Sequence, residues 1–143
     1  MAQTYEDLEV WKRACRLAVC VYQAFDRKQP WGLQDQMQRS AVSIASNIAE
    51  GYERTTKDFI RFLTIAKGSA AELRTQALIA GKVNELKSEQ AKHIADEAKV
   101  LSKMLQSLIQ YRSTQIRESA ENYAFSPGDG SLRTSSGDSP EQS

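Results

Sequence analysis

The stretch RSAVSIASNIAEG, residues 39–51, holds the pattern that decides the fold. Its apolar residues recur at steps of three and four, as one face of an α-helix requires. Ser40, Ser43, Asn47 and Glu50 run through it as a polar line, which is open to three interpretations: a catalytic groove, a nucleic-acid contact or a seam between helices. No strong base, acid or nucleophile accompanies the line. The pattern therefore favours the seam, in which small polar side chains fix helix alignment.

The same period predicts four helices, over residues 6–25, 33–52, 55–81 and from 88 to about 112–117. Thr4, Thr55 and Ser88 stand where helix N-caps are expected. Gly51 and Gly81 with Asn84 are expected to close the second and third helices. The predicted core lines are Leu8, Trp11, Cys15, Ala18, Tyr22 and Phe25; Leu33, Met37, Ala41, Ile44 and Ile48; Phe59, Phe62, Leu63, Ala66, Ala70, Leu73, Ala77 and Ala80; and Ala91, Ile94, Ala98, Leu101, Leu105 and Leu108.

Short links force neighbouring helices antiparallel, so the sequence predicts an all-α, up-down-up-down four-helix bundle over residues 1–117. No strand pattern interrupts it. Residues 118–143 are acidic and rich in Ser, Gly and Pro, and are expected to form a disordered tail because they hold too little apolar area to offset chain entropy.

Composition narrows the class of protein further. The 143 residues suit one domain, and no apolar run approaches the ~20 residues of a membrane span. The N-terminus lacks a basic start followed by an apolar block, so we expect a cytoplasmic protein without membrane contact. Cys15 and Cys20 point in different directions on one helix, which predicts two reduced thiols.

Three helices carry a second apolar face beside the predicted core line. An exposed apolar row of this kind usually marks a partner surface, so we expect copies of the chain to associate through it. The alternative is a wide core with these residues at its margins. The second faces consist of Val10, Leu17 and Val21; Val42, Ala45 and Ala49; and Val100, Met104 and Tyr111.

Charge divides the chain into a basic body and an acidic tail. Residues 1–117 hold 18 Lys and Arg against 13 Asp and Glu, a net charge of +5, whereas residues 118–143 carry a net charge of −4. Two basic clusters stand out, and repeated around an oligomer they would attract phosphates. The alternative is an ordinary solvated face. The clusters are Lys12, Arg13 and Arg16, and Arg54, Lys57 and Arg61.

Catalytic signatures are missing from the sequence. A di-iron bundle needs two Glu-x-x-His units, but His93 is the chain's one histidine, and the ladder of Glu89, His93 and Glu97 lies off the core line. No G-x-S-x-G, P-loop or G-x-G-x-x-G segment occurs. We therefore expect no enzyme, no metal and no cofactor, with a metal-dependent enzyme as the least favoured alternative.

Three segments, YEDLEVWKRA from Tyr5, GLQDQMQRSAVSIASNIAEGYER from Gly32 and FIRFLTIAKGSAAEL from Phe59, resemble the four helix bundle protein family. That family includes proteins encoded in intervening sequences of bacterial 23S rRNA genes and is similar to the accessory protein of diversity-generating retroelements. The resemblance covers about residues 5–112. Positions matching the family motif are Arg39, Ser43, Asn47, Glu50, Gly51, Gly68, Ser69 and Glu72.

The resemblance implies an antiparallel bundle that assembles as a ring of subunits, a pentamer, without catalytic residues. By analogy with the retroelement relatives it also implies contact with RNA or DNA. Two hypotheses follow: a homo-oligomeric scaffold whose basic surface binds nucleic acid, and a protein–protein assembly module that touches none. Within either, an ion pair between Arg39 and Glu72 is expected to tie the second helix to the third.

Overall fold

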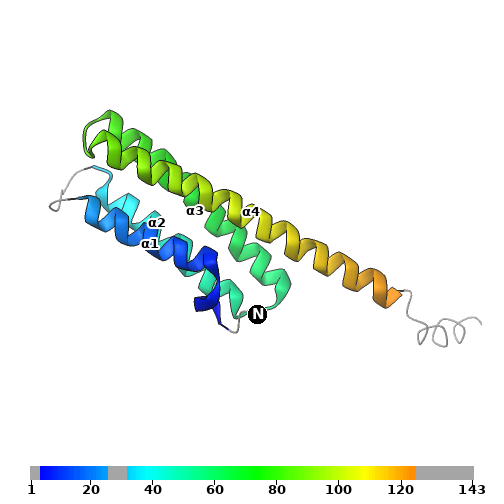
Figure 1. Cartoon of the computed structure of the whole chain (residues 1–143). Helices are drawn as coiled ribbons and strands as arrows, with labels where there is room; N and C mark the ends of the chain where they lie inside the picture. The colour runs from blue at the N-terminus through cyan, green and yellow to red at the C-terminus, as the bar shows by residue number, and fades with distance from the viewer. Residues whose placement is uncertain (1–3, 26–31, 125–143) are drawn as a thin grey trace, which may run out of the picture.

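A computed structural model describes residues 4–25 and 32–124 (Figure 1). A short 3₁₀ turn, η1, spans Tyr5–Asp7. Four α-helices follow: α1 at Glu9–Ala24, α2 at Gln34–Tyr52, α3 at Thr56–Lys82 and α4 at Ser88–Ala124. The predicted all-α four-helix bundle is confirmed.

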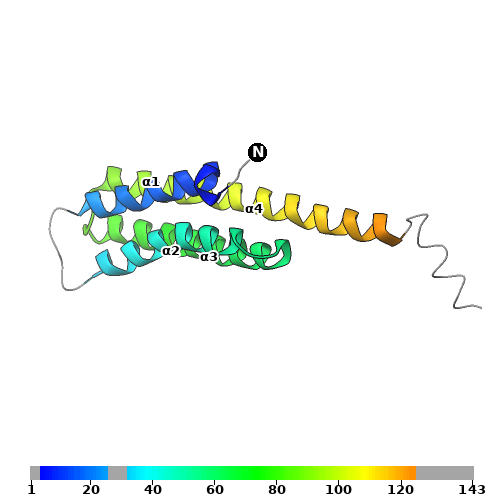
Figure 2. The same ribbon diagram turned by 90° about the horizontal axis from the view of Figure 1, so that it is seen from below.

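The helices form a closed ring of neighbours. α1 packs on α2, α2 on α3, α3 on α4, and α4 returns to α1. Figure 2 shows α1 and α2 lying along the half of the molecule near the α3–α4 turn, while α4 runs on past them. The bundle is therefore complete over part of its length and opens toward the C-terminal end of α4.

Local sequence explains where the helices begin and end. The capping box of Thr4 and Asp7 forms, but it starts η1, and α1 begins later, after Leu8. The Thr55 hydroxyl accepts a hydrogen bond from the Asp58 amide at 3.2 Å and caps α3. Asn84 takes a positive φ of 64°, which ends the α3 path.

The predicted core lines of the second, third and fourth helices are confirmed, except that Leu33, Phe62 and Leu108 are only partly buried. Gly51 is not a C-terminal glycine. It lies inside α2, where a Cβ would come 2.5 Å from Phe62 Cβ, so close packing of α2 on α3 requires the absence of a side chain.

The predicted core face of α1 is wrong except at Phe25, which is buried as expected. The bundle buries Ala14 and Ala24 together with three residues assigned to the second face, Val10, Leu17 and Val21. These three are core residues and cannot meet another copy. The line expected in the core turns outward: Trp11, Cys15 and Ala18 are half-buried and Tyr22 is 52% exposed.

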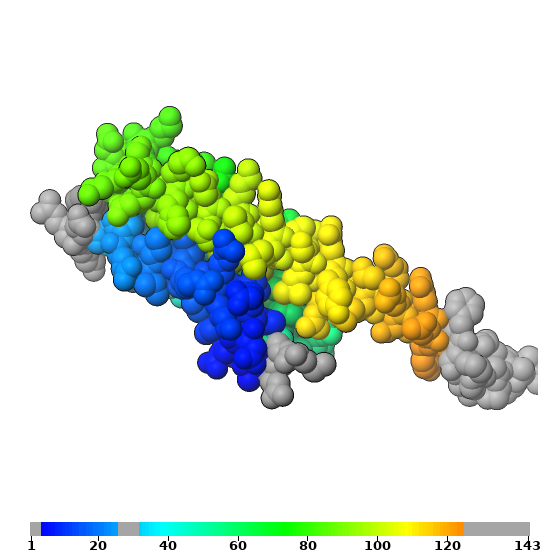
Figure 3. Space-filling view, in the orientation of Figure 1, coloured from blue at the N-terminus to red at the C-terminus, as the bar shows by residue number. Residues whose placement is uncertain are grey.

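The C-terminal boundary also differs from the sequence prediction. α4 continues to Ala124 instead of fading at residues 112–117, so residues 118–124, assigned to the tail, are helical. Figure 3 shows this end of α4 projecting from the body of the molecule. The rest of the predicted tail, residues 125–143, lies outside the described residues.

Candidate functional site

The polar line of α2 packs against α3. The hydroxyls of Ser43 and Ser69 lie 2.8 Å apart, and the Asn47 amide donates to both the carbonyl and the hydroxyl of Ser43, at 2.8 and 3.0 Å. Ser40 and Ser69 are each only 7% exposed. These hydrogen bonds satisfy polar groups where two helices approach closely, so the arrangement joins helices rather than presenting a reactive group.

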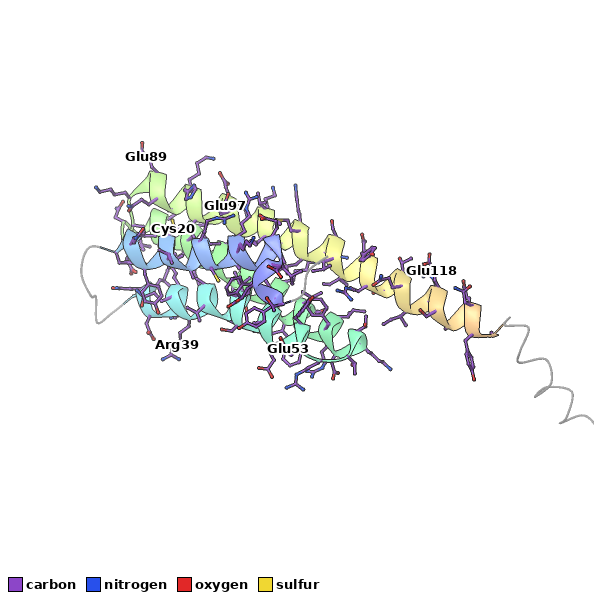
Figure 4. The ribbon with its side chains drawn as sticks, turned by 60° about the horizontal axis from the view of Figure 1, so that its bottom comes forward. Cys20, Arg39, Glu53, Glu89, Glu97 and Glu118 are labelled. Atoms are coloured by element: carbon purple, nitrogen blue, oxygen red, sulfur yellow. The ribbon has the colours of Figure 1, made fainter. Side chains whose placement is uncertain are left out.

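Beside this seam, a polar groove opens between α2 and α3, lined by Gln36, Arg39, Ser40, Ser43, Glu72 and Gln76. The predicted Arg39–Glu72 ion pair does not form. Arg39 Nε instead lies 3.1 Å from Asp35 Oδ2, one turn earlier on the same helix. Figure 4 shows Arg39 pointing away from the bundle. The i, i+4 geometry is the shorter reach, so the local partner is preferred.

The basic cluster of α1 faces α4. Arg13 donates two hydrogen bonds to the Glu97 carboxylate, from Nε at 3.0 Å and from Nη2 at 3.1 Å. These hydrogen bonds hold the pKa of Glu97 below its usual value. Lys12 lies 3.9 Å from Glu9. Three α1 residues, Lys12, Arg13 and Arg16, were predicted to contact nucleic acid. Lys12 and Arg13 therefore already have carboxylate neighbours.

The second basic cluster surrounds Phe62 at the start of α3. The guanidinium of Arg61 lies 4.6 Å from the Phe62 ring centroid and that of Arg54 lies 5.0 Å from it. Arg54 also pairs with Glu50, one turn earlier. Lys57 is exposed. This end of the bundle therefore presents the aromatic ring of Phe62 beside two guanidinium groups, and Lys57 and Arg61 are exposed to solvent.

The two basic clusters do not form one surface. Figure 4 labels a neighbour of each cluster: Glu97, where α4 meets α1, and Glu53, at the α2–α3 turn. A ligand touching both would have to reach around the bundle, from the α1–α4 side to the α2–α3 turn. A phosphate-binding surface is therefore better supplied by the α3 cluster alone, which keeps more of its charge available.

An apolar groove runs between α1 and α2 on the outside of the bundle. It has a volume of about 390 Å³ and is lined by Tyr5, Trp11, Cys15, Ala18, Val19, Val42, Ala45, Ser46 and Ala49. Val19 is 55% and Val42 is 42% exposed. The α2 residues proposed for self-contact thus line this groove, and three of their α1 neighbours, Trp11, Cys15 and Ala18, are residues that the sequence placed in the core.

The proposed α4 face is divided. Val100 and Met104 are half-buried, and Met104 packs against the core, whereas Tyr111 is 60% exposed. This face is separate from the α1/α2 groove, because α2 and α4 are not neighbours in the ring. It therefore offers a second, weaker apolar surface rather than an extension of the first.

A third cleft, between α1 and α4, brings together Cys20, Glu89 and His93. Burial raises the pKa of the Cys20 thiol, and the charge of Glu97 adds to the effect. A raised pKa keeps sulfur in the unreactive thiol form. Glu97 is occupied by Arg13. Among residues 4–25 and 32–124, no group of three His, Cys, Asp or Glu side chains is placed to hold a metal ion.

Sequence reasoning missed the Arg13–Glu97 pair, because their separation of 84 positions carries no local signal. It also missed Tyr5 and Val19 as groove residues. Val19 could have been recognised from the sequence, since it is an apolar residue that lies on neither apolar line of its helix.

These features define a small four-helix-bundle protein with a hydrogen-bonded α2–α3 seam and open surfaces on its outside. The chain belongs to the 23S rRNA-intervening sequence protein family, whose model matches residues 6–107. A crystal structure of a protein of unknown function, from the S23 ribosomal protein family of Bacteroides thetaiotaomicron, is 25% identical. It superimposes with a TM-score of 0.65, over 70% of this chain and 97% of that one. No curated protein matches this sequence.

The comparisons also delimit the family's part of the molecule. The family match ends at residue 107, close to the last fully buried core residue of α4, Leu105. The remainder of α4, to Ala124, lies beyond it. Within the described residues, no helix is both long and apolar enough to cross a membrane.

Proposed function

We propose that this protein is a non-enzymatic, homo-oligomeric helical bundle that contacts RNA or DNA through the basic start of α3. The apolar α1/α2 groove is the observation that carries the proposal. Two helices of one bundle leave Val19 and Val42 exposed along a continuous apolar depression. Exposed apolar patches of this kind mark partner surfaces. A second copy of the same chain is a partner that is present wherever the protein is made.

A ring of subunits needs two different surfaces on each copy, because a head-to-tail contact joins one patch to another. A candidate for the second is the outer face of α3, where Ile65, Gly68 and Ile79 lie on the helix and Val83 follows directly after it; the three large side chains are exposed, and Glu72 and Gln76 divide them into two pairs. A Cβ at Gly68 would meet nothing within 4 Å, so packing within the chain does not require this glycine. A neighbouring helix on that face would. This pair of surfaces supports the proposed pentameric ring.

The nucleic-acid part of the proposal depends on Lys57 and Arg61. Both are exposed, and the described residues include no carboxylate within ion-pair distance of either. A guanidinium that lies over an aromatic ring can also stack against a base. Around a ring of subunits these cations would repeat, which adds to the field that attracts phosphates.

The assembly is tested by Val42→Glu, which places a charge in the groove. Sedimentation velocity of the unmodified chain should show an oligomer, and the variant should show a lower mass with unchanged helix content. Gln110→Glu adds the same charge at an exposed position of α4, away from both surfaces, and should leave the mass unchanged. A monomeric unmodified chain would overturn the assembly part of the proposal.

Nucleic-acid contact is tested by titrating mixed RNA and DNA at increasing salt. Replacing Lys57 and Arg61 by Gln should weaken binding and reduce the salt dependence, since each lost phosphate contact lowers the slope of log K against log salt by about 0.7–0.9. The matched control replaces Lys82 and Lys87, at the opposite end of the bundle. A chain ending at Ala124 should bind more tightly, because removal of residues 125–143 takes away acidic groups.

A protein–protein assembly module without nucleic acid is the alternative. Glu97 and Glu50 favour it, because they neutralise Arg13 and Arg54 and so reduce the basic surface. No detectable binding at low salt, with and without residues 125–143, would establish this alternative in place of the nucleic-acid contact.

A further inference from the structure

Two phenylalanine rings lie near the start of α3, and they differ in what can reach them. Phe59 is 2% exposed, and the Arg112 guanidinium lies 5.2 Å from its ring centroid. Phe62 is half-buried, and both of its guanidinium neighbours, Arg54 and Arg61, are exposed. The Phe62 ring with its two arginines is therefore the one of the two that a ligand can approach from solvent.

Phe62 is held in place by the packing of α2 on α3. A Cβ at Gly51 would come 2.5 Å from Phe62 Cβ and 3.2 Å from Phe62 Cγ, so this side chain stands directly against the backbone of α2. A ring fixed in this way offers its guanidinium neighbours a constant support. A ligand that stacks there does not have to order the ring first, which lowers the entropic cost of binding.

The two arginines beside Phe62 differ in their partners. Arg54 pairs with Glu50, one turn earlier. Among residues 4–25 and 32–124, no carboxylate lies within ion-pair distance of Arg61. Its guanidinium lies 4.6 Å from the Phe62 ring centroid, and the side chain is exposed. Unstacked nucleobases bind to planar groups of this kind, so Arg61 is the side chain best suited to receive one.

The charges around this ring are balanced. Residues 50–61 hold three basic and three acidic side chains, a net charge of zero: Arg54, Lys57 and Arg61 against Glu50, Glu53 and Asp58. A duplex carries one negative charge per about 1.7 Å of its axis, and a single strand carries half that density. A duplex lying here would set phosphates against the exposed Glu53 as well as against the cations. A flexible single strand can place one phosphate at Lys57 and turn its other phosphates away from Glu53.

We propose that the start of α3 takes single-stranded nucleic acid, with an unpaired base stacked on the Arg61 guanidinium and a neighbouring phosphate at Lys57. This inference rests on the nucleic-acid contact proposed above and names its substrate class. Within a duplex, neighbouring base pairs cover the faces of each base, so Arg61 would meet phosphate alone. Strands of RNA and of DNA both fit, because every base has a π-face.

Fluorescence anisotropy with labelled oligonucleotides of equal length tests the inference on the full chain. The probes are an oligo-U strand, an oligo-dT strand, an abasic DNA strand with the same phosphates, and a DNA duplex. Both base-containing strands should bind at least about 5-fold more tightly than the abasic strand and the duplex, because one stacked base adds at least that factor. Comparison of oligo-U with oligo-dT distinguishes RNA from DNA as the source of the base.

The outcomes separate this inference from the proposal on which it rests. Equal affinity for the abasic strand, or for the duplex, would overturn the single-strand inference and leave the nucleic-acid contact standing. No binding of any probe at low salt would overturn both.

Arg61→Lys keeps the positive charge and removes the planar guanidinium. The variant should bind the base-containing strands about as weakly as the unmodified chain binds the abasic strand, and its affinity for the abasic strand should not change. Arg117→Lys makes the same exchange at an exposed position of the projecting end of α4 and should change neither affinity. Circular dichroism should show the same helix content in all three chains. An equal loss of affinity for all strands in Arg61→Lys would assign Arg61 to phosphate alone and overturn the stacking, as would an unchanged preference for strands with bases.

Discussion

Two apolar lines run along α1, and the bundle treats them differently. Val10, Ala14, Leu17 and Val21 are buried at the centre of the molecule. The second line, of Trp11, Cys15, Ala18 and Tyr22, has the same spacing and larger side chains, yet it lines the outer groove or faces solvent. Val10, Ala14, Leu17 and Val21 are buried because their face of α1 packs against both α2 and α4. The difference teaches that the bulk of an apolar line does not decide which line enters the core.

Leu17→Ala tests the comparison most strongly. Leu17 is 2% exposed in the core, so truncation should lower the free energy of unfolding by about 2–4 kcal/mol through lost burial and a residual cavity. Chemical denaturation followed by circular dichroism measures it. Val19→Ala, on the exposed side of the same helix, is the matched control and should change stability by less than about 0.5 kcal/mol. Similar losses for both variants would mean that the two sides of α1 are equally buried in solution.

Sequence alone predicted α2, α3 and most of α4, including their buried lines, because in each of these helices the longest apolar line at helical spacing is the buried one. α1 has two lines about 100° apart. Its charged residues, Glu9, Lys12, Arg13 and Arg16, lie opposite the midpoint of the two lines and favour neither. The Arg13–Glu97 contact that distinguishes the lines joins residues far apart in sequence.

The residues of the candidate surfaces were predicted less completely, because they too depend on which face of each helix is buried and on where each helix ends. Val42, Ala45 and Ala49 were recognised as a separate face because α2 has a single core line. The far end of α4 was assigned to the tail because Ser119, Glu121 and Asn122 are polar. The heptad spacing of Ile109, Ile116 and Tyr123 that continues through these polar residues is visible only once the helix is known to extend.

Two glycines allow the same comparison, between a closely packed position and an open one, in α2 and α3. A Cβ at Gly51 would lie 2.5 Å from Phe62 Cβ and 3.0 Å from a Phe59 ring carbon. Gly51→Ala should therefore destabilise the bundle by about 1–3 kcal/mol through overpacking. Gly68→Ala, in open space, should stabilise it by up to about 1 kcal/mol, since Ala is the better helix former.

Thermal unfolding of the two glycine variants beside the unmodified chain measures both effects. Opposite signs are expected for the same chemical change. Stabilisation by Gly51→Ala would show that α2 and α3 are farther apart than the structure has them. A loss of oligomer mass in Gly68→Ala, with a stable fold, would be direct support for a neighbouring helix on that face.

The smallest expected change in stability comes from the Arg13–Glu97 pair, which lies on the charged side of α1 and not on either apolar line. Glu97→Gln should cost about 0.5–1 kcal/mol at neutral pH, a modest value because the two side chains are 36% and 25% exposed. The pKa of Glu97 is lowered in the fold, so its stabilising contribution is present above the ordinary glutamate value of 4.5. That contribution is lost as the pH falls through the lowered pKa. The free energies of unfolding of the two chains should therefore differ from neutral pH down to about pH 4.5 and converge below it. A difference that persists unchanged in strong acid would mean that Glu97 stabilises α1 by packing alone, and the charge would then have no part in choosing which line of α1 faces the core.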